Sequence, residues 1–245
     1  MAPTTVLISG ANRGLGKGLA ARYLSQPDHI VIAANRDPEH ATSKALASLP
    51  KAPGSSLIIV KVDAMSNTDS FDAVKDLQEQ GIDHLDIVIA NSGIMEGFFM
   101  IRDITIDAFS RHMDTNLFGV VRLFQATLPL LHKSDNPKFI SMGSATASIG
   151  KMLPFNLTMY ATSKAAVHWM TKRINEEEEK ITSFVLSPGW ARSDMGNTAA
   201  MGYGLQQAPV PVQESCDGMF KVINNATKES SGGKFLNFSG KEEVW

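Results

Sequence analysis

Short apolar segments alternate along the chain with longer stretches in which apolar residues recur at helical spacing. Seven segments rich in Val and Ile are flanked by turn residues, at 6–8, 30–34, 57–62, 87–90, 139–140, 184–186 and 235–236. Continuous apolar segments of this length are typical of strands that are buried on both faces of a parallel sheet. The intervening stretches predict helices near 15–25, 66–80, 106–132, 160–179 and 213–227.

This alternation of strands and helices predicts one α/β domain over residues 1–245. We expect a single-domain Rossmann fold, in which a doubly wound seven-stranded parallel sheet is flanked by helices. A chain of 245 residues is close to the upper size of a single hydrophobic core. Residues 195–213 contain three glycines and two prolines, and there we expect a mobile substrate loop.

The composition argues against several classes of function. The net charge is −2 and 20% of the residues are charged, so the chain has no basic field for nucleic acid or an anionic membrane. No apolar run approaches the ~18 residues of a transmembrane helix, and the first residues lack the basic segment of a signal peptide. Cys216 is the only cysteine, which excludes an intramolecular disulfide. We therefore expect a cytoplasmic protein without nucleic-acid or membrane partners.

Three glycines follow the first predicted strand, Gly10, Gly14 and Gly16, with Leu15 between the last two. A strand that turns sharply into a helix needs positions without side chains if a phosphate is to approach the free N–H groups of the helix. Those N–H groups and the helix dipole favour a pyrophosphate. Because the glycines stand between a strand and an amphipathic helix, they favour a dinucleotide site over an ordinary turn.

Two arginines and an asparagine indicate which dinucleotide binds. The second strand ends with Asn35 and Arg36, where NAD-binding sites usually carry an acid for the ribose hydroxyls. Arg13, within the glycine turn, can face the same place. A pair of guanidinium groups suits a 2′-phosphate dianion. The pattern predicts NADP(H) as the cofactor, although two ordinary surface arginines would look the same in the sequence.

Tyr160 and Lys164 are spaced four residues apart at the start of a predicted helix, which places them on one face. A free phenol has a pKa of about 10 and is a poor acid–base catalyst at neutral pH. A nearby ammonium stabilises the phenolate and so makes proton transfer possible. On its own this spacing is common on helical surfaces, so its meaning depends on the motifs around it.

Together the motifs resemble those of the short-chain dehydrogenase/reductase family, in the same order and over essentially the whole chain. They are the glycine turn at 10–16, Asp63 after the third strand, Asn91 with Gly93 after the fourth, Asn116, Ser144 after the fifth, Tyr160 with Lys164, and Pro188 with Gly189 after the sixth. The ending at 238–245 resembles the branch of C-factor and sniffer-type carbonyl reductases. The surroundings of Arg13 and of residues 28–29 and 149–150 are similar to fungal norsolorinic acid ketoreductase-like proteins.

The resemblance implies a catalytic role for four residues. Tyr160 would donate a proton to the carbonyl oxygen of the substrate. Ser144 would hold that oxygen while its negative charge develops. Lys164 would favour the phenolate and hold the nicotinamide ribose. Asn116 would interrupt its helix and order a water that relays protons to Lys164.

The same resemblance implies further contacts with NADP(H), beside the glycine turn, Tyr160 and Lys164. They are Asp63 and the backbone of Ala64 toward the adenine, Asn91 and Gly93 toward the adenosine side, and Pro188, the backbone of Ala191 and the hydroxyl of Ser193 toward the nicotinamide carboxamide. In such a site the cofactor carries the redox chemistry, and the protein orients it and supplies the proton.

The catalytic serine has three candidates. Ser144 is preferred because it follows a glycine directly after the fifth strand, as is common in the family. Ser141 and Ser148 are rivals because the gap of sixteen residues between Ser144 and Tyr160 is long for the family. With Ser144 as the catalytic serine, residues 151–157 would bulge over the substrate pocket.

Three segments are expected to line that pocket, at 94–101, 152–157 and 190–203. Their methionine and aromatic side chains are Met95, Phe98, Phe99, Met100, Met152, Phe155, Trp190, Met195, Met201 and Tyr203. Flexible thioethers and aromatic rings suit a bulky apolar or aromatic substrate, although part of this set could instead seal the core or a subunit interface.

These features predict an NADPH-dependent reductase that converts a small-molecule ketone or aldehyde, for example a secondary metabolite, to an alcohol. Two alternatives stay open on the same scaffold: a protein that senses NADP(H) without turnover, and a non-redox biosynthetic enzyme. The presence of Asn116, Ser144, Tyr160 and Lys164 favours the enzyme over the sensor.

The family resemblance also implies an oligomeric state. Members of the family commonly pack two long helices against their copies across a two-fold axis, so the resemblance implies a homodimer or homotetramer. Such an interface needs a self-complementary apolar stripe. The side chains that could form it are Val120, Phe124, Val167, Met170 and Ile174.

Overall fold

A computed structural model describes residues 2–245 of the protein. Seven strands form one sheet in the order β3-β2-β1-β4-β5-β6-β7, and each neighbouring pair is parallel. The strands are β1 (Thr4–Ser9), β2 (His29–Asn35), β3 (Ser56–Lys61), β4 (Ile87–Ala90), β5 (Lys138–Met142), β6 (Thr182–Ser187) and β7 (Phe235–Asn237). The expected doubly wound parallel sheet is confirmed.

The strand order changes direction between β1 and β4. From β1 the chain first builds outward to β3, and from β4 it then builds outward the other way to β7. In sheets of this kind the connections on the two sides of the switch point diverge and leave a crevice beyond the carboxyl ends of the strands. The segments that follow β1, β4, β5 and β6 therefore meet at one edge of the sheet.

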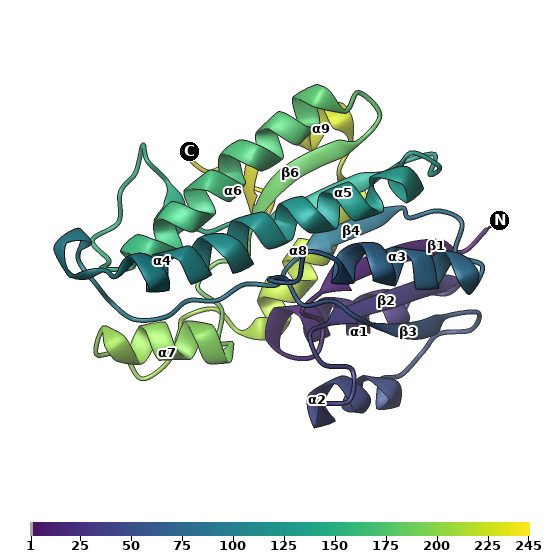
Figure 1. Cartoon of the computed structure of the whole chain (residues 1–245), viewed down its shortest axis with the longest axis horizontal. Coiled ribbons are helices and arrows are strands. Elements are labelled where there is room, and N and C mark those ends of the chain that lie inside the picture. The colour runs from purple at the N-terminus through teal and green to yellow at the C-terminus, as the bar shows by residue number, and fades with distance from the viewer. Residues whose placement is uncertain (1) are drawn as a thin grey trace.

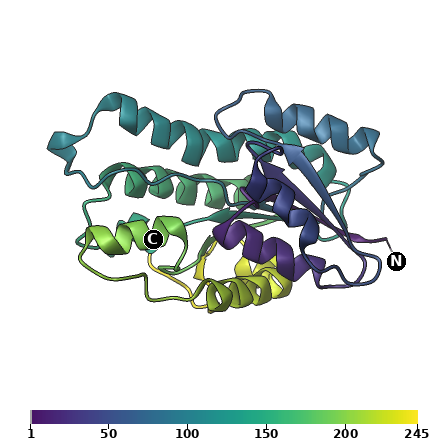
Figure 2. The ribbon, with the colours of Figure 1, turned by 90° about the horizontal axis from the view of Figure 1, so that it is seen from below.

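Helices cover both faces of the sheet (Figures 1 and 2). They are α1 (Gly14–Leu24), α2 (Ala41–Lys44), α3 (Asp69–Glu79), α4 (Ile106–Met113), α5 (Gly119–Leu131), α6 (Thr158–Glu177), α7 (Asp194–Gly202), α8 (Val212–Asn225) and α9 (Lys228–Ser231). α3, α5 and α6 pack on one face, and α1 and α8 pack on the other. No helix within residues 2–245 is long and apolar enough to cross a membrane.

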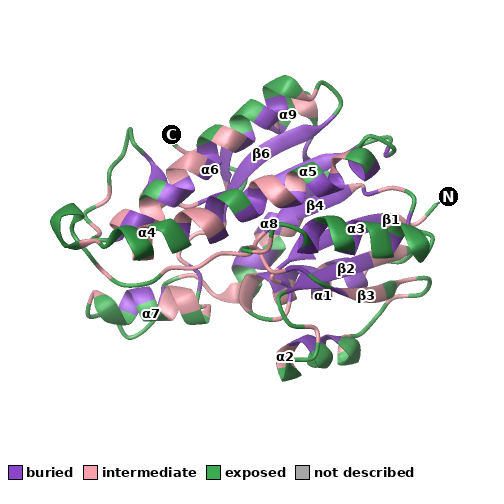
Figure 3. Cartoon of the chain, viewed as in Figure 1, coloured by how far each residue is buried: buried purple, intermediate pink, exposed green. Residues whose placement is uncertain are grey.

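Two hydrophobic cores lie on opposite faces of the sheet. Successive strand residues point to opposite faces, so Leu7 of β1 joins the core beneath α3, α5 and α6, whereas its neighbour Ile8 joins the core beneath α1 and α8. Both side chains are at most 1% exposed. Figure 3 shows the strands as mostly buried and the outer faces of the helices as exposed.

The structure bears on the helix expected over 106–132 and on the loop expected over 195–213. The long helix expected over 106–132 is α4 and α5 joined by a π-helical turn at Asp114–Phe118, so the interruption expected at Asn116 is present. The loop expected over 195–213 is wrong for its first part, because α7 occupies Asp194–Gly202. Its start is stabilised by Ser193, whose side chain accepts a hydrogen bond from the Gly196 N–H.

The apolar stripe expected at a two-fold axis is also wrong. Val120, Val167 and Ile174 are 4%, 0% and 5% exposed, because they form the core between α5, α6 and the sheet. Phe124 and Met170 are packed against the same core. The helical spacing of these residues therefore marks the face that packs on the sheet, and it does not identify a subunit interface.

Candidate active site

The glycine turn between β1 and α1 is closed tightly on itself. Gly10 and Gly14 have φ angles of +64° and +53°, a region that side chains disfavour. A Cβ atom added to Gly16 would lie 2.3 Å from the carbonyl oxygen of Gly10. The amide of Asn91, after β4, donates hydrogen bonds of 2.8 Å to Ser9 O and 3.2 Å to Gly10 O. Asn91 thus holds the turn in place.

The first turn of α1 has neither a capping side chain nor an acidic residue. Its N-cap residue is Arg13, whose Nη1 instead forms an exposed ion pair of 3.0 Å with Asp194 of α7. A Cβ atom on Gly14 would lie 3.5 Å from Cβ of Ser193, so the chain that follows β6 comes close to the glycine turn. Leu15 packs its side chain against the core under α1. Within the described residues, the N–H groups at the start of α1 are therefore capped neither by a side chain nor by an acidic residue of their own turn.

At the end of β2, Asn35 is 1% exposed, and neither its side-chain nitrogen nor its oxygen has a hydrogen-bond partner in the described part of the chain. A buried polar group without a partner typically costs about 1–3 kcal/mol. The next residue, Arg36, is exposed, and among residues 2–245 its side chain has no ion-pair or hydrogen-bond partner. Asn35 therefore leaves two buried polar atoms unpartnered at the end of β2, while Arg36 is available at the surface.

The segment after β3 is fixed to the start of α5. Oδ1 of Asp63 accepts a hydrogen bond of 3.0 Å from the N–H of Met65. Arg122 of α5 donates hydrogen bonds of 2.8 Å to Ala64 O and to Oδ1 of Asn67. The expected adenine residues Asp63 and Ala64 are thereby held at the edge of the crevice.

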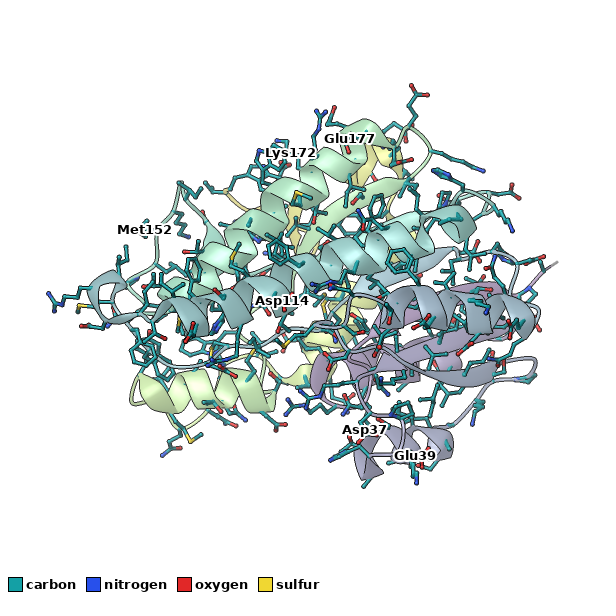
Figure 4. All side chains as sticks on the ribbon, viewed as in Figure 1. Asp37, Glu39, Asp114, Met152, Lys172 and Glu177 are labelled. Atoms are coloured by element: carbon teal, nitrogen blue, oxygen red, sulfur yellow. The ribbon has the colours of Figure 1, made fainter. Side chains whose placement is uncertain are left out.

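The guanidinium of Arg122 also forms an ion pair of 2.8 Å with Asp114. Asp114 lies at the junction of α4 and α5, in the middle of the molecule as seen in Figure 4. The same arginine therefore ties the adenine side of the crevice to the π-helical turn.

Tyr160 and Lys164 lie on the first turns of α6, with Nζ 5.9 Å from the centre of the phenol ring. Lys164 is 4% exposed, and its Nζ donates a hydrogen bond of 2.8 Å to Met142 O at the end of β5. Burial lowers the pKa of Lys164 to about 8. Burial raises the pKa of Tyr160, and the side-chain hydrogen bond to Ser144 opposes this only in part. At neutral pH the phenol therefore holds its proton beside a lysine that loses its own more easily than usual.

Asn116 is fully buried in the π-helical turn, and its side-chain amide forms hydrogen bonds with the segment that follows β4. Its Nδ2 donates to Ile94 O at 3.0 Å and to Oγ of Ser163 at 2.9 Å, and its Oδ1 accepts from the N–H of Ile94 at 2.8 Å. A Cβ atom on Gly93 would lie 3.2 Å from that Oδ1 and 3.6 Å from Nζ of Lys164. Asn116, Gly93 and Lys164 therefore meet at one point.

The three candidate serines have different surroundings. Ser144 is the one that lies near enough to Tyr160 to lower the pKa of the phenol against the effect of burial. Its Oγ lies 2.8 Å from Oγ1 of Thr146. Ser141 is fully buried within β5. Ser148 donates a hydrogen bond of 3.1 Å to Trp245 O. The geometry thus brings Ser144 to the phenol, and it directs Ser141 and Ser148 elsewhere.

The segments after β6 approach the same edge. Pro188 O accepts a hydrogen bond of 2.7 Å from Ser215 Oγ, and Ala191 pairs with Val210 in a parallel bridge. Ser193 Oγ accepts from the Gly196 N–H at 3.2 Å, which leaves its own proton free to donate.

The three expected pocket segments do meet, through aromatic rings. Tyr203 packs against Phe98 and Phe155, with ring centres 5.4 Å and 4.7 Å apart, and Phe155 packs against Trp190 at 5.6 Å. We call these four side chains the aromatic cluster. The loop between β5 and α6 also carries Met152, which is 81% exposed and lies on the outside of the molecule in Figure 4.

Comparison with known proteins decides the family. The model of the short chain dehydrogenase family matches residues 4–203. The chain belongs to the short-chain dehydrogenase family. As a short-chain dehydrogenase it is an oxidoreductase, and the matched residues include the glycine turn, Asn116, Tyr160 and Lys164.

Relatives of this short-chain dehydrogenase are similar over nearly their whole length. The short-chain dehydrogenase RED3 of Pyricularia oryzae is 39% identical over 96% of both chains. The norsolorinic acid ketoreductase nor1 of Dothistroma septosporum is 40% identical, over 95% of this chain and 89% of that protein. Among solved structures, the NADPH-bound carbonyl reductase from chicken fatty liver is 30% identical, with a TM-score of 0.88 over 100% of both chains.

One residue beside this site has no signal in the sequence. The N–H of Ser144 donates a hydrogen bond of 3.2 Å to Nε2 of His168 on α6. A single histidine in a helical segment belongs to none of the motifs above, so only the tertiary contact reveals it.

Proposed function

We propose that the protein reduces a ketone or aldehyde to an alcohol with NADPH, and that Tyr160 is the proton donor. The observation that carries the proposal is that Tyr160, Ser144 and Lys164 come together at the carboxyl edge of the sheet. Ser144 lies near enough to lower the pKa of the phenol, and Nζ of Lys164 lies 5.9 Å from the ring centre. Names among the relatives support it, since they include norsolorinic acid ketoreductases and an NADPH-bound carbonyl reductase.

The crevice fits a phosphorylated dinucleotide. The start of α1 offers N–H groups that no side chain caps, and positions 10, 14 and 16 of the glycine turn carry no side chain that would hold a pyrophosphate away from them. Exposed Arg36 suits a 2′-phosphate. Arg13 would join it by exchanging its exposed ion pair with Asp194 for the phosphate. Asp63 and Ala64 would meet the adenine, and Pro188, Ala191 and Ser193 would meet the carboxamide.

NADPH, when bound, supplies a hydride to the carbonyl carbon. Tyr160 then gives the proton of its hydroxyl to the carbonyl oxygen. The raised pKa of Tyr160 suits this direction, because the phenol is protonated at neutral pH before it reacts. Lys164 stabilises the resulting phenolate, and the Ser144 hydroxyl donates a hydrogen bond to the oxygen as its negative charge grows.

The aromatic cluster supports a bulky apolar or aromatic substrate. Phe98, Phe155, Trp190 and Tyr203 come from three segments that begin or end near the catalytic residues. Flat rings attract an aromatic or apolar ligand through stacking and burial. A secondary metabolite with a ketone on an aromatic framework is of this kind.

A homodimer is the proposed assembly. With the expected stripe buried, the apolar side chains on the outer faces of α5 and α6 are few, and Trp169 of α6 is the largest of them at 65% exposed. Phe118, directly before α5, is 48% exposed. Burying both across a two-fold axis would remove this apolar surface from water.

The test is turnover with NADPH and a panel of apolar, aromatic and small polar carbonyl compounds, followed by nicotinamide absorbance. We expect Tyr160→Phe to lower kcat by about 10²–10⁴-fold, the usual contribution of general acid catalysis. Its affinity for NADPH should change little, because the phosphate and adenine contacts lie elsewhere. Near-full activity of Tyr160→Phe would refute the proton-donor role and favour a non-redox reaction. NADPH binding without turnover of any carbonyl would favour a sensor.

A further inference from the structure

The last residues of the chain fold back onto α6. After β7 the chain turns and forms an antiparallel bridge between Leu236 and Glu242, and the N–H of Glu243 donates a hydrogen bond of 2.7 Å to Phe235 O. This return places Trp245 against the side of α6 that faces the catalytic serine. Lys172 of α6 (labelled in Figure 4) lies with Nζ 4.9 Å from the centre of the indole.

Trp245 and Phe235 enclose His168. The imidazole is 3% exposed, and its ring centre lies 4.4 Å from that of Phe235 and 5.9 Å from that of Trp245. Burial and the nearby charge of Lys164 lower the pKa of His168 to about 3. The ring is therefore neutral at physiological pH, and its Nε2 carries a lone pair that accepts the Ser144 N–H at 3.2 Å.

The approach of this imidazole to the backbone requires the glycine before Ser144. A Cβ atom on Gly143 would lie 2.6 Å from Nε2 of His168 and 2.2 Å from Cγ1 of Val185. After β5 the backbone at 143–144 therefore passes between His168 and Val185. His168 thereby fixes the direction of the chain at Ser144.

Trp245 holds the far side of the same loop. Its carbonyl oxygen accepts hydrogen bonds of 2.6 Å from the N–H of Gly150 and 3.1 Å from Oγ of Ser148. The loop that begins at Ser144 is therefore fixed at its start through His168 and again at 148–150 through Trp245.

We propose that His168 and Trp245 are positioning residues for Ser144, which they hold at the distance that its contact with the carbonyl oxygen requires. This inference rests on the proposed reductase function. Neither residue touches substrate or cofactor in this role. Its physical basis is that an oxyanion donor acts only at hydrogen-bond distance from the developing charge, and a misplacement of about 1 Å can cost about 10²-fold in rate.

A double-mutant cycle with Ser144→Ala tests the positioning role of His168 and Trp245. We expect His168→Leu, which cannot accept a hydrogen bond, to lower kcat about tenfold in the enzyme with Ser144, as the loss of one buried hydrogen bond would do. In the Ser144→Ala enzyme the same change should lower kcat by less than about twofold, because the effects of two residues that act through one group are not additive. His168→Gln, whose amide oxygen can accept from the same N–H, should recover most of the activity.

Trp245→Ala provides the second arm. It removes the indole that encloses His168 and keeps the main-chain oxygen that binds residues 148–150, so it should follow the same pattern through His168. Dissociation constants for NADPH should stay within about twofold in every variant, because the proposal concerns the chemical step. His132→Leu is the matched control: His132 also makes a hydrogen bond, of 2.8 Å, but to Glu178 at the surface, and its loss should leave kcat unchanged in both backgrounds.

Equal losses in both backgrounds would overturn the proposal, because the two residues would then act on general stability and not through Ser144. No loss from either substitution would also overturn it. If His168→Leu does not fold, the cycle with Trp245→Ala decides. Absence of turnover in the unaltered protein would instead count against the reductase function itself, so the two failures are distinguishable.

Discussion

Replacing Lys164 with methionine is expected to make the folded protein more stable while removing the ammonium that the proposed chemistry needs. The side chain is 4% exposed, and burial lowers its pKa from 10.5 to about 8. A lowered pKa means that folding opposes the charged form. The protein therefore carries a protonated lysine at neutral pH in a place that favours the neutral one.

The size of the effect follows from this difference in pKa. At 1.36 kcal/mol per pKa unit, the buried ammonium costs about 3 kcal/mol of folding free energy at neutral pH. Methionine fills a similar volume without charge, but it leaves Met142 O without its hydrogen bond, a loss of about 1–2 kcal/mol. The net expectation for Lys164→Met is a gain of about 1–2 kcal/mol in the free energy of unfolding at neutral pH, with reductase activity lost.

The pH dependence gives a sharper test. Between the folded pKa of about 8 and the unfolded pKa of 10.5, the unfolded chain binds more protons at Lys164 than the folded protein does. The free energy of unfolding must therefore rise with pH in this window. From about pH 7 to about pH 9.5 the unaltered protein should gain about 2 kcal/mol relative to Lys164→Met, measured by urea denaturation. The reasoning would be refuted if Lys164→Met were less stable than the unaltered protein at pH 7 and the difference in their free energies of unfolding were the same at pH 9.5.

Three further outcomes are expected. Arg36→Asp should abolish or invert a preference for NADPH over NADH of at least about tenfold, measured as dissociation constants; equal affinities in the unaltered protein would contradict the cofactor assignment. Ser144→Ala should lower kcat on the order of 10²-fold, and alanine at Ser141 or Ser148 far less; a larger loss at either rival would move the oxyanion role there. Light scattering at micromolar concentration should give the mass of a dimer, and Trp169→Glu should give that of a monomer; a monomeric unaltered protein would exclude the dimer.

The parallel sheet could be predicted because its strands depend on local pattern. Short apolar segments flanked by turn residues identified the strands, and the glycines at 10–16 identified the first connection into α1. The pairing of Tyr160 with Lys164 was equally predictable, since helical spacing alone places both on one face. The interruption at Asn116 followed from the family resemblance, and the π-helical turn confirms it.

What could not be predicted depends on tertiary packing. Helical periodicity cannot tell which partner covers an apolar face, and so Val167 and Ile174 appeared available for a second subunit although the sheet buries them. Glycines and prolines at 195–213 concealed α7, although Ser193 and Asp194 are a recognisable helix start. His168 has no local signal, because its partners Ser144, Phe235 and Trp245 are distant in sequence.

The aromatic cluster lies outside both hydrophobic cores. Phe98, Phe155, Trp190 and Tyr203 are only half-buried, and they belong to the connections beyond the carboxyl ends of the strands. Substitutions there alter the surface offered to a substrate without opening a cavity under α1 or α5, so their effect on folding should be small. Descendants of one ancestral gene could therefore diverge in the compounds they accept while they inherit the same catalytic residues. In this architecture such divergence costs little folding stability.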